Sequence, residues 1–171
     1  MKEKLANIEL LLLDVDGVLT DAGIIYSDSG EQIKKFNAKD GLGIKLLMEA
    51  GVKVGIITGL SSQALEHRCQ KLGISLLFAG VENKSKVLGS IISQTGINPE
   101  NMVFVGDDLI DLPVMKQVGV SFCVADGCDD VKRHCDIITN LKGGHGAVRE
   151  VCESILKAKG LWSDILNKYL S

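Results

Sequence analysis

The chain has 171 residues, 46% of them hydrophobic, which suits a single globular domain over residues 1–171. A formal net charge of −3 and an aromatic content of 4% exclude the basic footprint and the base-stacking platforms of a nucleic-acid-binding protein. The chain has no apolar run of about 18 residues that would predict a membrane span, and its five cysteines without a CxxC pair are typical of free thiols in a reducing compartment, so we expect a cytoplasmic protein.

The first predicted elements are a strand, a hairpin and a helix. Residues 8–15 contain four consecutive leucines, which is typical of a strand buried on both faces of a parallel sheet. Two β-prone runs within residues 23–36 flank a glycine-containing turn and predict a hairpin. An isolated hairpin is only marginally stable, so we expect this one to pack on something else, such as another subunit. A helical pattern then begins at Asp40 and stops at Gly51.

Strands and helices alternate through the rest of the chain. Further strands are predicted at residues 52–58, 74–79, 102–106, 120–124 and 136–139. Helices are predicted after the candidate caps Ser61 or Ser62, after Asn83, up to residue 118, and over residues 147–159. A glycine-rich segment, residues 143–146, predicts a flexible link, and residues 160–171 form a C-terminal tail. This alternation predicts an α/β fold with a mainly parallel, doubly wound (Rossmann-like) sheet.

Three of the predicted strands deliver polar side chains to the same edge of that sheet. Asp14 and Asp16 follow the first strand, Thr58 ends the second, and Asp107 with Asp108 follows the fourth. Carboxylates two residues apart in an extended chain lie on one side of the backbone, and they repel each other unless a positive group lies near them. We therefore expect a divalent-cation site with a carboxylate nucleophile, although each segment taken alone could be an ordinary turn.

Four segments resemble, in the same order, the four motifs of the haloacid dehalogenase superfamily of phosphatases. They are the run from Asp14 to Thr20, Thr58 in Ile56-Ile57-Thr58-Gly59, Lys84 in Glu82-Asn83-Lys84, and the run from Gly106 to Asp111. The resemblance implies a phosphatase that uses Mg²⁺, whose metal ligands are Asp14, the main-chain carbonyl of Asp16, and Asp107.

The chemistry of these residue types agrees with the resemblance. A carboxylate such as Asp14 can attack phosphorus and form an acyl phosphate. Asp16 can protonate the leaving alcohol and later activate water. Hard oxygen ligands suit Mg²⁺. We therefore expect hydrolysis through an aspartyl-phosphate intermediate.

Further side chains are expected at the phosphate and around the metal. The resemblance implies that Thr58 hydrogen-bonds a phosphate oxygen and that Lys84 supplies a positive charge to it. Spacing alone does not separate Lys84 from Lys86, so Lys86 stays open as the alternative. Asp108 and Asp111 are expected to orient the groups that touch the metal and the phosphate.

Members of this superfamily usually carry a large insertion that covers the site, but the interval between the first motif and Thr58 has room only for the hairpin and one helix. Short chains without such a cap resemble the phosphatases of eight- and nine-carbon sugar acids. This chain most resembles those that act on 3-deoxy-D-manno-octulosonate 8-phosphate (Kdo 8-phosphate) in lipopolysaccharide precursor synthesis, through residues 36–43, 65–69, 106–115 and 146–151. The resemblance implies a homotetramer assembled through the hairpins, with a neighbour's C-terminal tail helping to cover the site.

The same resemblance implies a substrate-binding group, which consists of Asp16, Asn37, Ala38, Lys39, Asp40, Gly41, Lys45, Arg68 and Lys84. A sugar-acid phosphate carries a carboxylate as well as a phosphate, and Lys39, Lys45 and Arg68 could recognise that second anion. The family commonly has arginine at the positions of Leu60 and His145. A nine-carbon sugar acid 9-phosphate therefore stays open as the alternative substrate.

A signalling receiver module is the alternative from another functional class. Receivers also gather aspartate, threonine and lysine side chains at the ends of parallel strands and carry a phospho-aspartate. They lack the hairpin and the Gly-Asp-Asp-x-x-Asp run that this chain has at residues 106–111. The residues therefore favour the phosphatase.

Overall fold

The leucine run lies at the centre of the molecule. In the computed structural model, which describes residues 1–170, strand β1 (Leu10–Leu13) pairs in parallel with β4 (Lys53–Ile57) and with β6 (Met102–Gly106). All four leucines are fully buried, because alternate side chains enter two hydrophobic cores on opposite faces of the sheet. The burial of this strand on both faces confirms the interpretation of the leucine run.

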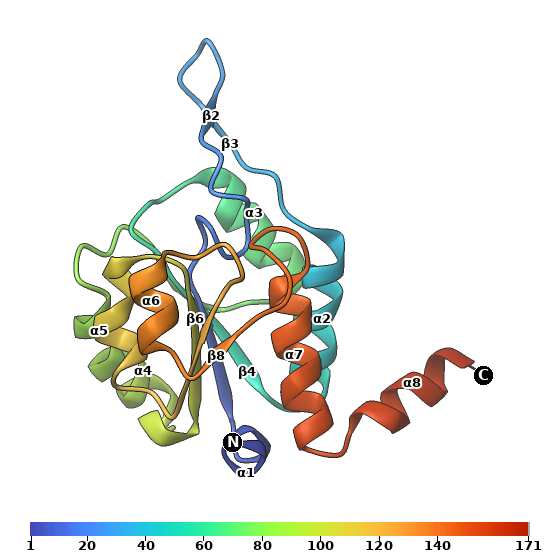
Figure 1. The fold of residues 1–171 in the computed structure, drawn as a ribbon. Coiled ribbons are helices and arrows are strands. Elements are labelled where there is room, and N and C mark those ends of the chain that lie inside the picture. The colour runs from blue at the N-terminus through green and yellow to red at the C-terminus, as the bar shows by residue number, and fades with distance from the viewer. Residues whose placement is uncertain (171) are drawn as a thin grey trace.

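The remaining strands extend the sheet on both sides of β1. Six parallel strands run in the order β5-β4-β1-β6-β7-β8 (Figure 1), in which β5 is Leu76–Phe78, β7 is Val120–Cys123 and β8 is Ile137–Ile138. The chain winds outward from β1 through β4 to β5, and then crosses back to β6. At this point of reversal the carboxyl ends of β4, β1 and β6 lie side by side, which is where α/β proteins place their sites. The doubly wound sheet is therefore confirmed.

Helices cover both faces of the sheet (Figure 1). One face carries α1 (Lys2–Ala6), α2 (Ala38–Glu49), α3 (Gln63–Leu72) and α7 (Ala147–Ala158). The other carries α4 (Val87–Thr95), α5 (Leu112–Met115) and α6 (Asp129–His134). Three short 3₁₀ helices complete the connections, namely η1 (Lys84–Lys86), η2 (Pro99–Asn101) and η3 (Leu109–Asp111). Ser62, not Ser61, caps α3, because its side chain accepts the N–H of Leu65.

The segment after β6 differs from its prediction. A single helix up to residue 118 was expected, but the chain forms η3 and then α5, which ends at Met115. The cause is a capping box, in which the Asp108 carboxylate accepts the N–H of Leu109 while the Asp111 carboxylate accepts the N–H of Asp108. The tight turn folds the Asp111 side chain back toward the end of β6. The helices α1 and α6 were not predicted at all.

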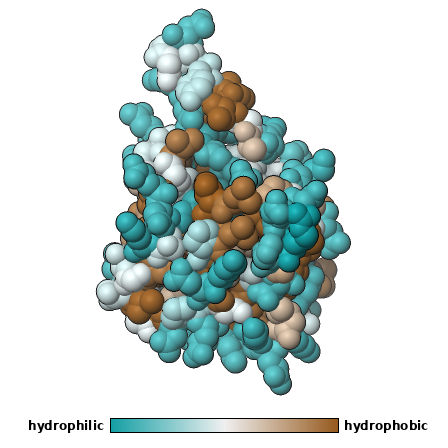
Figure 2. Space-filling model, turned by 60° about the vertical axis from the view of Figure 1, so that its left-hand side comes forward, coloured by the Kyte–Doolittle hydropathy of each residue, from teal (hydrophilic) through white to brown (hydrophobic). Residues whose placement is uncertain are grey.

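The hairpin projects from the carboxyl edge of the sheet (Figure 1). Its two strands, β2 (Ile25–Tyr26) and β3 (Gln32–Ile33), are shorter than the predicted runs. Large hydrophobic side chains on it are half or more exposed, and Figure 2 shows brown atoms on the projection below its polar tip. Between β1 and β4 the chain forms only this hairpin and α2, so no large cap is inserted there.

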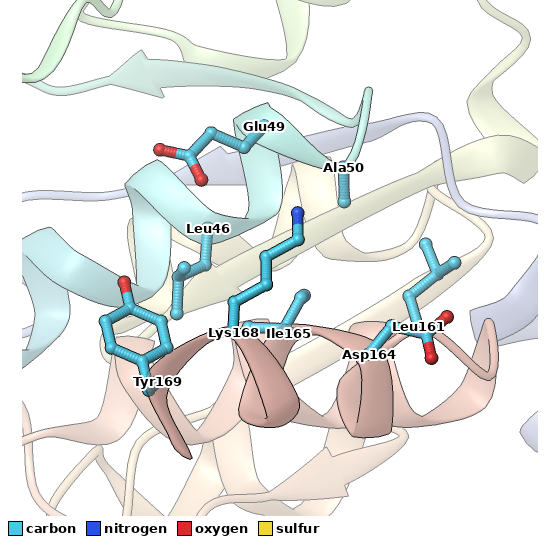
Figure 3. A pocket seen from close by; sticks show the side chains of 8 residues that line it. All are labelled: Leu46, Glu49, Ala50, Leu161, Asp164, Ile165, Lys168 and Tyr169. Atoms are coloured by element: carbon cyan, nitrogen blue, oxygen red, sulfur yellow. The ribbon is translucent and has the colours of Figure 1, made fainter. Parts of the chain in front are cut away.

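The predicted C-terminal tail, residues 160–171, contains a helix, α8 (Trp162–Leu170), and its last residue lies outside the described residues. This helix leaves the body of the protein at the end away from the hairpin (Figure 1). It lies beside the end of α2, and a groove between the two helices is lined by Leu46, Glu49, Ala50, Leu161, Asp164, Ile165, Lys168 and Tyr169 (Figure 3). None of the predicted site residues lines this groove. Within residues 1–170, no helix is both long and apolar enough to cross a bilayer.

Candidate functional site

A buried lysine joins two buried aspartates at the carboxyl edge of the sheet. Asp14 follows β1, and its N–H donates to the carbonyl oxygen of Val105 on the neighbouring strand at 3.1 Å. The Nζ of Lys84 lies 2.5 Å from Asp14 Oδ1 and 2.7 Å from Asp111 Oδ1. Asp14 is 4% exposed and Lys84 3% exposed, so water screens this pair of contacts very little.

The structure separates the two lysines that spacing could not. Asn83 caps η1 by accepting the N–H of Ser85 at 3.1 Å, and Lys84 follows it directly, with its side chain directed at Asp14 and Asp111. Lys86 ends the same short helix and is exposed. Lys84 is therefore the lysine that reaches the aspartates.

Asp107 and Asp111 complete a cluster of three carboxylates. One oxygen from each of Asp14, Asp107 and Asp111 lies within 4.8 Å of the others. Asp111 Oδ2 also accepts the N–H groups of Asp107 at 2.9 Å and of Asp108 at 3.3 Å, so both oxygens of Asp111 accept hydrogen bonds within the protein. Asp14 and Asp107 supply the other two carboxylates of the cluster. Asp108 itself is exposed and caps η3.

A glycine makes the close approach of Asp107 feasible. Gly17 has a φ of +98°, and a Cβ at this position would lie 2.1 Å from Asp107 Oδ2. Gly17 lies in the turn after β1, in which the carbonyl oxygen of Val15 accepts the N–H of Leu19 at 2.9 Å. Both the backbone conformation and the lack of space therefore require glycine after the second aspartate of the Asp14-Val15-Asp16 motif.

The carboxylates carry more negative charge than the lysine balances. Burial, together with the charge of Asp111, raises the pKa of Asp14 from 3.8 to about 6, although Lys84 opposes the shift. Burial and the charges of Asp14 and Asp111 raise the pKa of Asp107 from 3.8 to about 8. Burial alone would lower the pKa of Lys84, but the two aspartates that it contacts raise it overall. A hard divalent cation with oxygen ligands, such as Mg²⁺, fits this donor set.

Removing divalent cations should make stability pH-dependent. Because Asp14 and Asp107 bind protons more tightly in the folded chain than in the unfolded one, the metal-free protein should lose unfolding free energy as the pH rises from about 4 to about 8. Since each unit of pKa shift corresponds to ~1.4 kcal/mol, we expect a loss of several kcal/mol, and a smaller one with Mg²⁺ present. Urea unfolding in EDTA across this pH range measures it, with Asp107→Asn as the control that flattens the slope. A constant or rising unfolding free energy in EDTA would contradict the electrostatic picture.

Thr58 and Asp16 lie at the same edge. Thr58 is 2% exposed at the end of β4, its N–H donates to the carbonyl oxygen of Phe78 at 2.9 Å, and its Oγ1 accepts the N–H of Leu60 at 3.4 Å. Asp16 lies in the turn after β1, and its carboxylate pairs with Lys34 of the hairpin. Sequence reasoning did not find Lys34. Side chains alternate along the extended leg of the hairpin, so either Lys34 or Lys35 must point inward. This alternation was the sequence signal that could have identified a buried lysine here.

Part of the predicted substrate-binding group lies together at the start of α2. Asn37 caps this helix and donates from Nδ2 to the carbonyl oxygen of Gly144 at 3.1 Å. Arg68 of α3 donates to the carbonyl oxygen of Asn37 at 3.0 Å, so it reaches this segment from the neighbouring helix. Ala38 and Lys39 are exposed beside it. These residues form one face at the start of α2.

The other predicted members of the group lie differently. Asp40 is 1% exposed, and its Oδ1 accepts the N–H of Arg149 at 2.8 Å. Its carboxylate therefore satisfies a backbone N–H in the first turn of α7. Gly41 is buried against Arg68, whose Nη2 would lie 2.3 Å from a Cβ at this position. Lys45 lies on the exposed side of α2.

The glycine-rich segment is packed and was wrongly predicted to be a flexible link. A Cβ on Gly143 would lie 1.7 Å from the carbonyl oxygen of Gly17, and the N–H of Gly144 donates to the carbonyl oxygen of Val18 at 2.9 Å. The segment therefore supports the turn that carries Asp16. Its glycines are required for close backbone contact, which composition alone does not distinguish from flexibility.

Comparison with known proteins agrees with this geometry. The family model of haloacid dehalogenase-like hydrolases matches residues 76–151. The 3-deoxy-D-manno-octulosonate 8-phosphate phosphatase of Escherichia coli (strain K12) is 46% identical over 157 residues, which are 92% of this chain and 84% of that protein. The crystal structure of the Yersinia pestis phosphatase of the same name has a TM-score of 0.93 and 42% identity, covering 95% of this chain and 88% of that one. The structure from Moraxella catarrhalis, in complex with magnesium, phosphate and Kdo, has a TM-score of 0.96 and 38% identity, covering 98% and 97%.

The doubly wound sheet and the aspartate–lysine cluster at its carboxyl edge define a haloacid dehalogenase-like hydrolase. At these levels of identity and coverage, the chain belongs to the 3-deoxy-D-manno-octulosonate 8-phosphate phosphatase family. The alternative of a receiver module is thereby disfavoured.

Proposed function

We propose that this chain is a single-domain, Mg²⁺-dependent phosphatase that hydrolyses Kdo 8-phosphate to Kdo and phosphate, a step in lipopolysaccharide precursor synthesis. The observation that carries the proposal is the buried contact of Lys84 with Asp14 and Asp111 beside Asp107, in a chain of this family. A carboxylate held at the end of a central strand, next to a fixed positive charge, is suited to attack a phosphate ester.

The reaction proceeds in two balanced steps. Asp14 attacks phosphorus and forms an aspartyl phosphate, while the bond between phosphorus and the sugar oxygen breaks and Asp16 gives its proton to that oxygen. Asp16 then takes a proton from water as the water attacks the aspartyl phosphate. Phosphate leaves, and Asp14 is free again.

The other residues of the cluster hold the phosphate and the metal. Thr58 hydrogen-bonds a phosphate oxygen, and the ammonium of Lys84 neutralises part of its charge. Asp14, the carbonyl oxygen of Asp16, and Asp107 would hold Mg²⁺, which would supply positive charge to the phosphoryl group. Asp108 and Asp111 fix the turn that presents Asp107, which the capping box and the bonds to Asp111 support.

The face at the start of α2 is proposed to bind the sugar acid. Asn37, Ala38, Lys39 and Arg68 lie beside one another there, and cationic side chains suit the carboxylate of the substrate. Lys45 belongs to the proposed group as a more distant cation on α2. Asp40 and Gly41 act by shaping the face, since the first holds α7 and the second admits Arg68.

Purified protein with Mg²⁺ should prefer Kdo 8-phosphate over other phosphate esters. We expect its kcat/KM to exceed that of glucose 6-phosphate by about 100-fold or more, because a site that pairs the carboxylate rejects an ester lacking it. A nine-carbon sugar acid 9-phosphate is the informative competitor, given Leu60 and His145. Phosphate release across the three esters measures the preference. A flat profile would reject the specific substrate, and a preference for the nine-carbon acid would reassign it.

We further propose a homotetramer assembled through the hairpins in the cytoplasm. The exposed hydrophobic side chains of the hairpin support this assembly, namely Ile24, Ile25, Tyr26 and Ile33 (Figure 2). A hairpin of two residue pairs also gains little stability alone. The cysteines are free thiols, which suits a reducing compartment. Light scattering of the purified chain measures the assembly directly.

A further inference from the structure

Lys34 lies directly after β3, on the leg of the hairpin that returns to the body of the protein. Its Nζ donates a hydrogen bond to Asp16 Oδ1, and the two groups form an ion pair. The Lys34 side chain is 4% exposed, whereas that of the next residue, Lys35, is 67% exposed and pairs with Asp21. Successive side chains of an extended chain point to opposite sides. Of these two lysines, Lys34 is therefore the one that faces Asp16.

The burial of Lys34 distinguishes it from an ordinary surface charge. Lysines are rarely buried unless they are paired, and exposed ion pairs such as that of Lys35 contribute little, because water and salt screen them. The pair of Lys34 with Asp16 is shielded from that screening. Within residues 1–170, Asp16 Oδ1 is the acceptor found for the Lys34 ammonium, so this cation is directed at one carboxylate.

We propose that Lys34 is a positioning residue for Asp16. The inference rests on the proposed function, in which Asp16 passes its proton to the leaving sugar oxygen. By binding Oδ1, Lys34 leaves Oδ2 for the proton transfer and fixes the orientation of a side chain that is 25% exposed and comes from a turn. Lys34 neither gains nor loses a proton in either step. The hairpin is thereby part of the active site.

The test compares two neighbouring lysines and two kinds of ester. Lys34→Met keeps most of the side-chain length and removes the charge, and Lys35→Met breaks the exposed pair on the same leg. Each variant is assayed for kcat/KM on Kdo 8-phosphate, whose sugar oxygen needs a proton to leave, and on p-nitrophenyl phosphate, whose nitrophenolate leaves without one. The ratio of the two losses reports on proton transfer to the leaving group.

For Lys34→Met we expect a loss of about 100-fold on Kdo 8-phosphate, the size of a general-acid contribution, and of less than about threefold on p-nitrophenyl phosphate. Lys35→Met should stay within about twofold on both, and Lys34→Arg should restore most of the loss. Equal losses on the two esters would overturn the proposal, because a structural defect lowers both rates alike. The absence of any loss on Kdo 8-phosphate would also overturn it. Lys34→Gln replaces Lys34→Met with the same expectation if thermal melting shows the latter unfolded.

The experiment distinguishes a failure of the proposed function from a failure of the proposed role of Lys34. If the unaltered protein does not hydrolyse Kdo 8-phosphate, the proposed function fails. The comparison then uses β-glycerophosphate as the alkyl ester, whose leaving oxygen also needs a proton. The same split between alkyl and nitrophenyl esters is expected, and its absence overturns the role of Lys34.

Discussion

Asp14→Asn is expected to abolish Mg²⁺-dependent phosphate release while leaving the fold intact. An amide oxygen is too weak a nucleophile to attack phosphorus, so kcat should fall by at least about 10⁴-fold. The replacement keeps the shape of the side chain, and its oxygen can still accept the hydrogen bond of Lys84, which also keeps its contact with Asp111. Phosphate release, together with detection of phosphorylated protein by mass spectrometry, measures the effect.

Two further variants serve as controls for the effect of Asp14→Asn. Asp129→Asn removes an exposed carboxylate in the first turn of α6 and should leave turnover unchanged. Asp16→Asn should still form the aspartyl phosphate with p-nitrophenyl phosphate but hydrolyse it slowly, so phosphorylated protein accumulates. Retained turnover in Asp14→Asn would contradict the assignment of Asp14 as the nucleophile. A phosphorylated Asp14→Asn protein would move it to another residue.

Lys84→Met is expected to damage both stability and activity. It leaves Asp14 and Asp111 facing each other with no cation between them, and their side chains are 6% and 0% exposed. Removing one partner of such a buried pair costs about 3 kcal/mol of unfolding free energy. Loss of the charge at the proposed phosphate site should also lower kcat about 10³-fold. Urea unfolding in EDTA at pH 8 measures the first effect, and phosphate release with Mg²⁺ the second.

Lys86→Met is the matched control for this change. It removes the same charge two residues away, from an exposed position of the same short helix. Its unfolding free energy should change by less than about 0.5 kcal/mol, and its turnover should be retained. Equal effects of the two substitutions would mean that Lys84 does not act through its contacts with the aspartates.

The sheet and the polar residues at its carboxyl edge could be predicted from local sequence patterns. A strand with four leucines has no polar face, so it can be stable only between two hydrophobic cores, and both cores are present. Once the strands are parallel, their carboxyl ends meet, which brings Asp14, Thr58 and Asp107 to one edge. Capping was also predictable at Asn83, because its side chain needs only neighbouring N–H groups.

The helices that were missed or misjudged depend on contacts beyond their own sequence. The short helix α6 has one buried residue, Val131, too few for a periodic pattern. The segment after β6 forms η3 and a short α5 because Asp111 turns back onto the backbone of Asp107 and Asp108. The composition of segment 143–146 predicts flexibility. Its packing against Gly17 depends on the fold and cannot be predicted from composition.

The amino-acid sequence by itself determined the central strand, the doubly wound sheet and the set of acidic residues at its edge, because burial and turn chemistry act between near neighbours. The tertiary structure decided which side chains meet. It selected Lys84 over Lys86 across a separation of 70 residues, turned Lys34 toward Asp16, and directed Asp40 to α7. The physical reason is that a lysine or an aspartate satisfies its charge with whichever partner packing brings near, and residue spacing does not contain that packing.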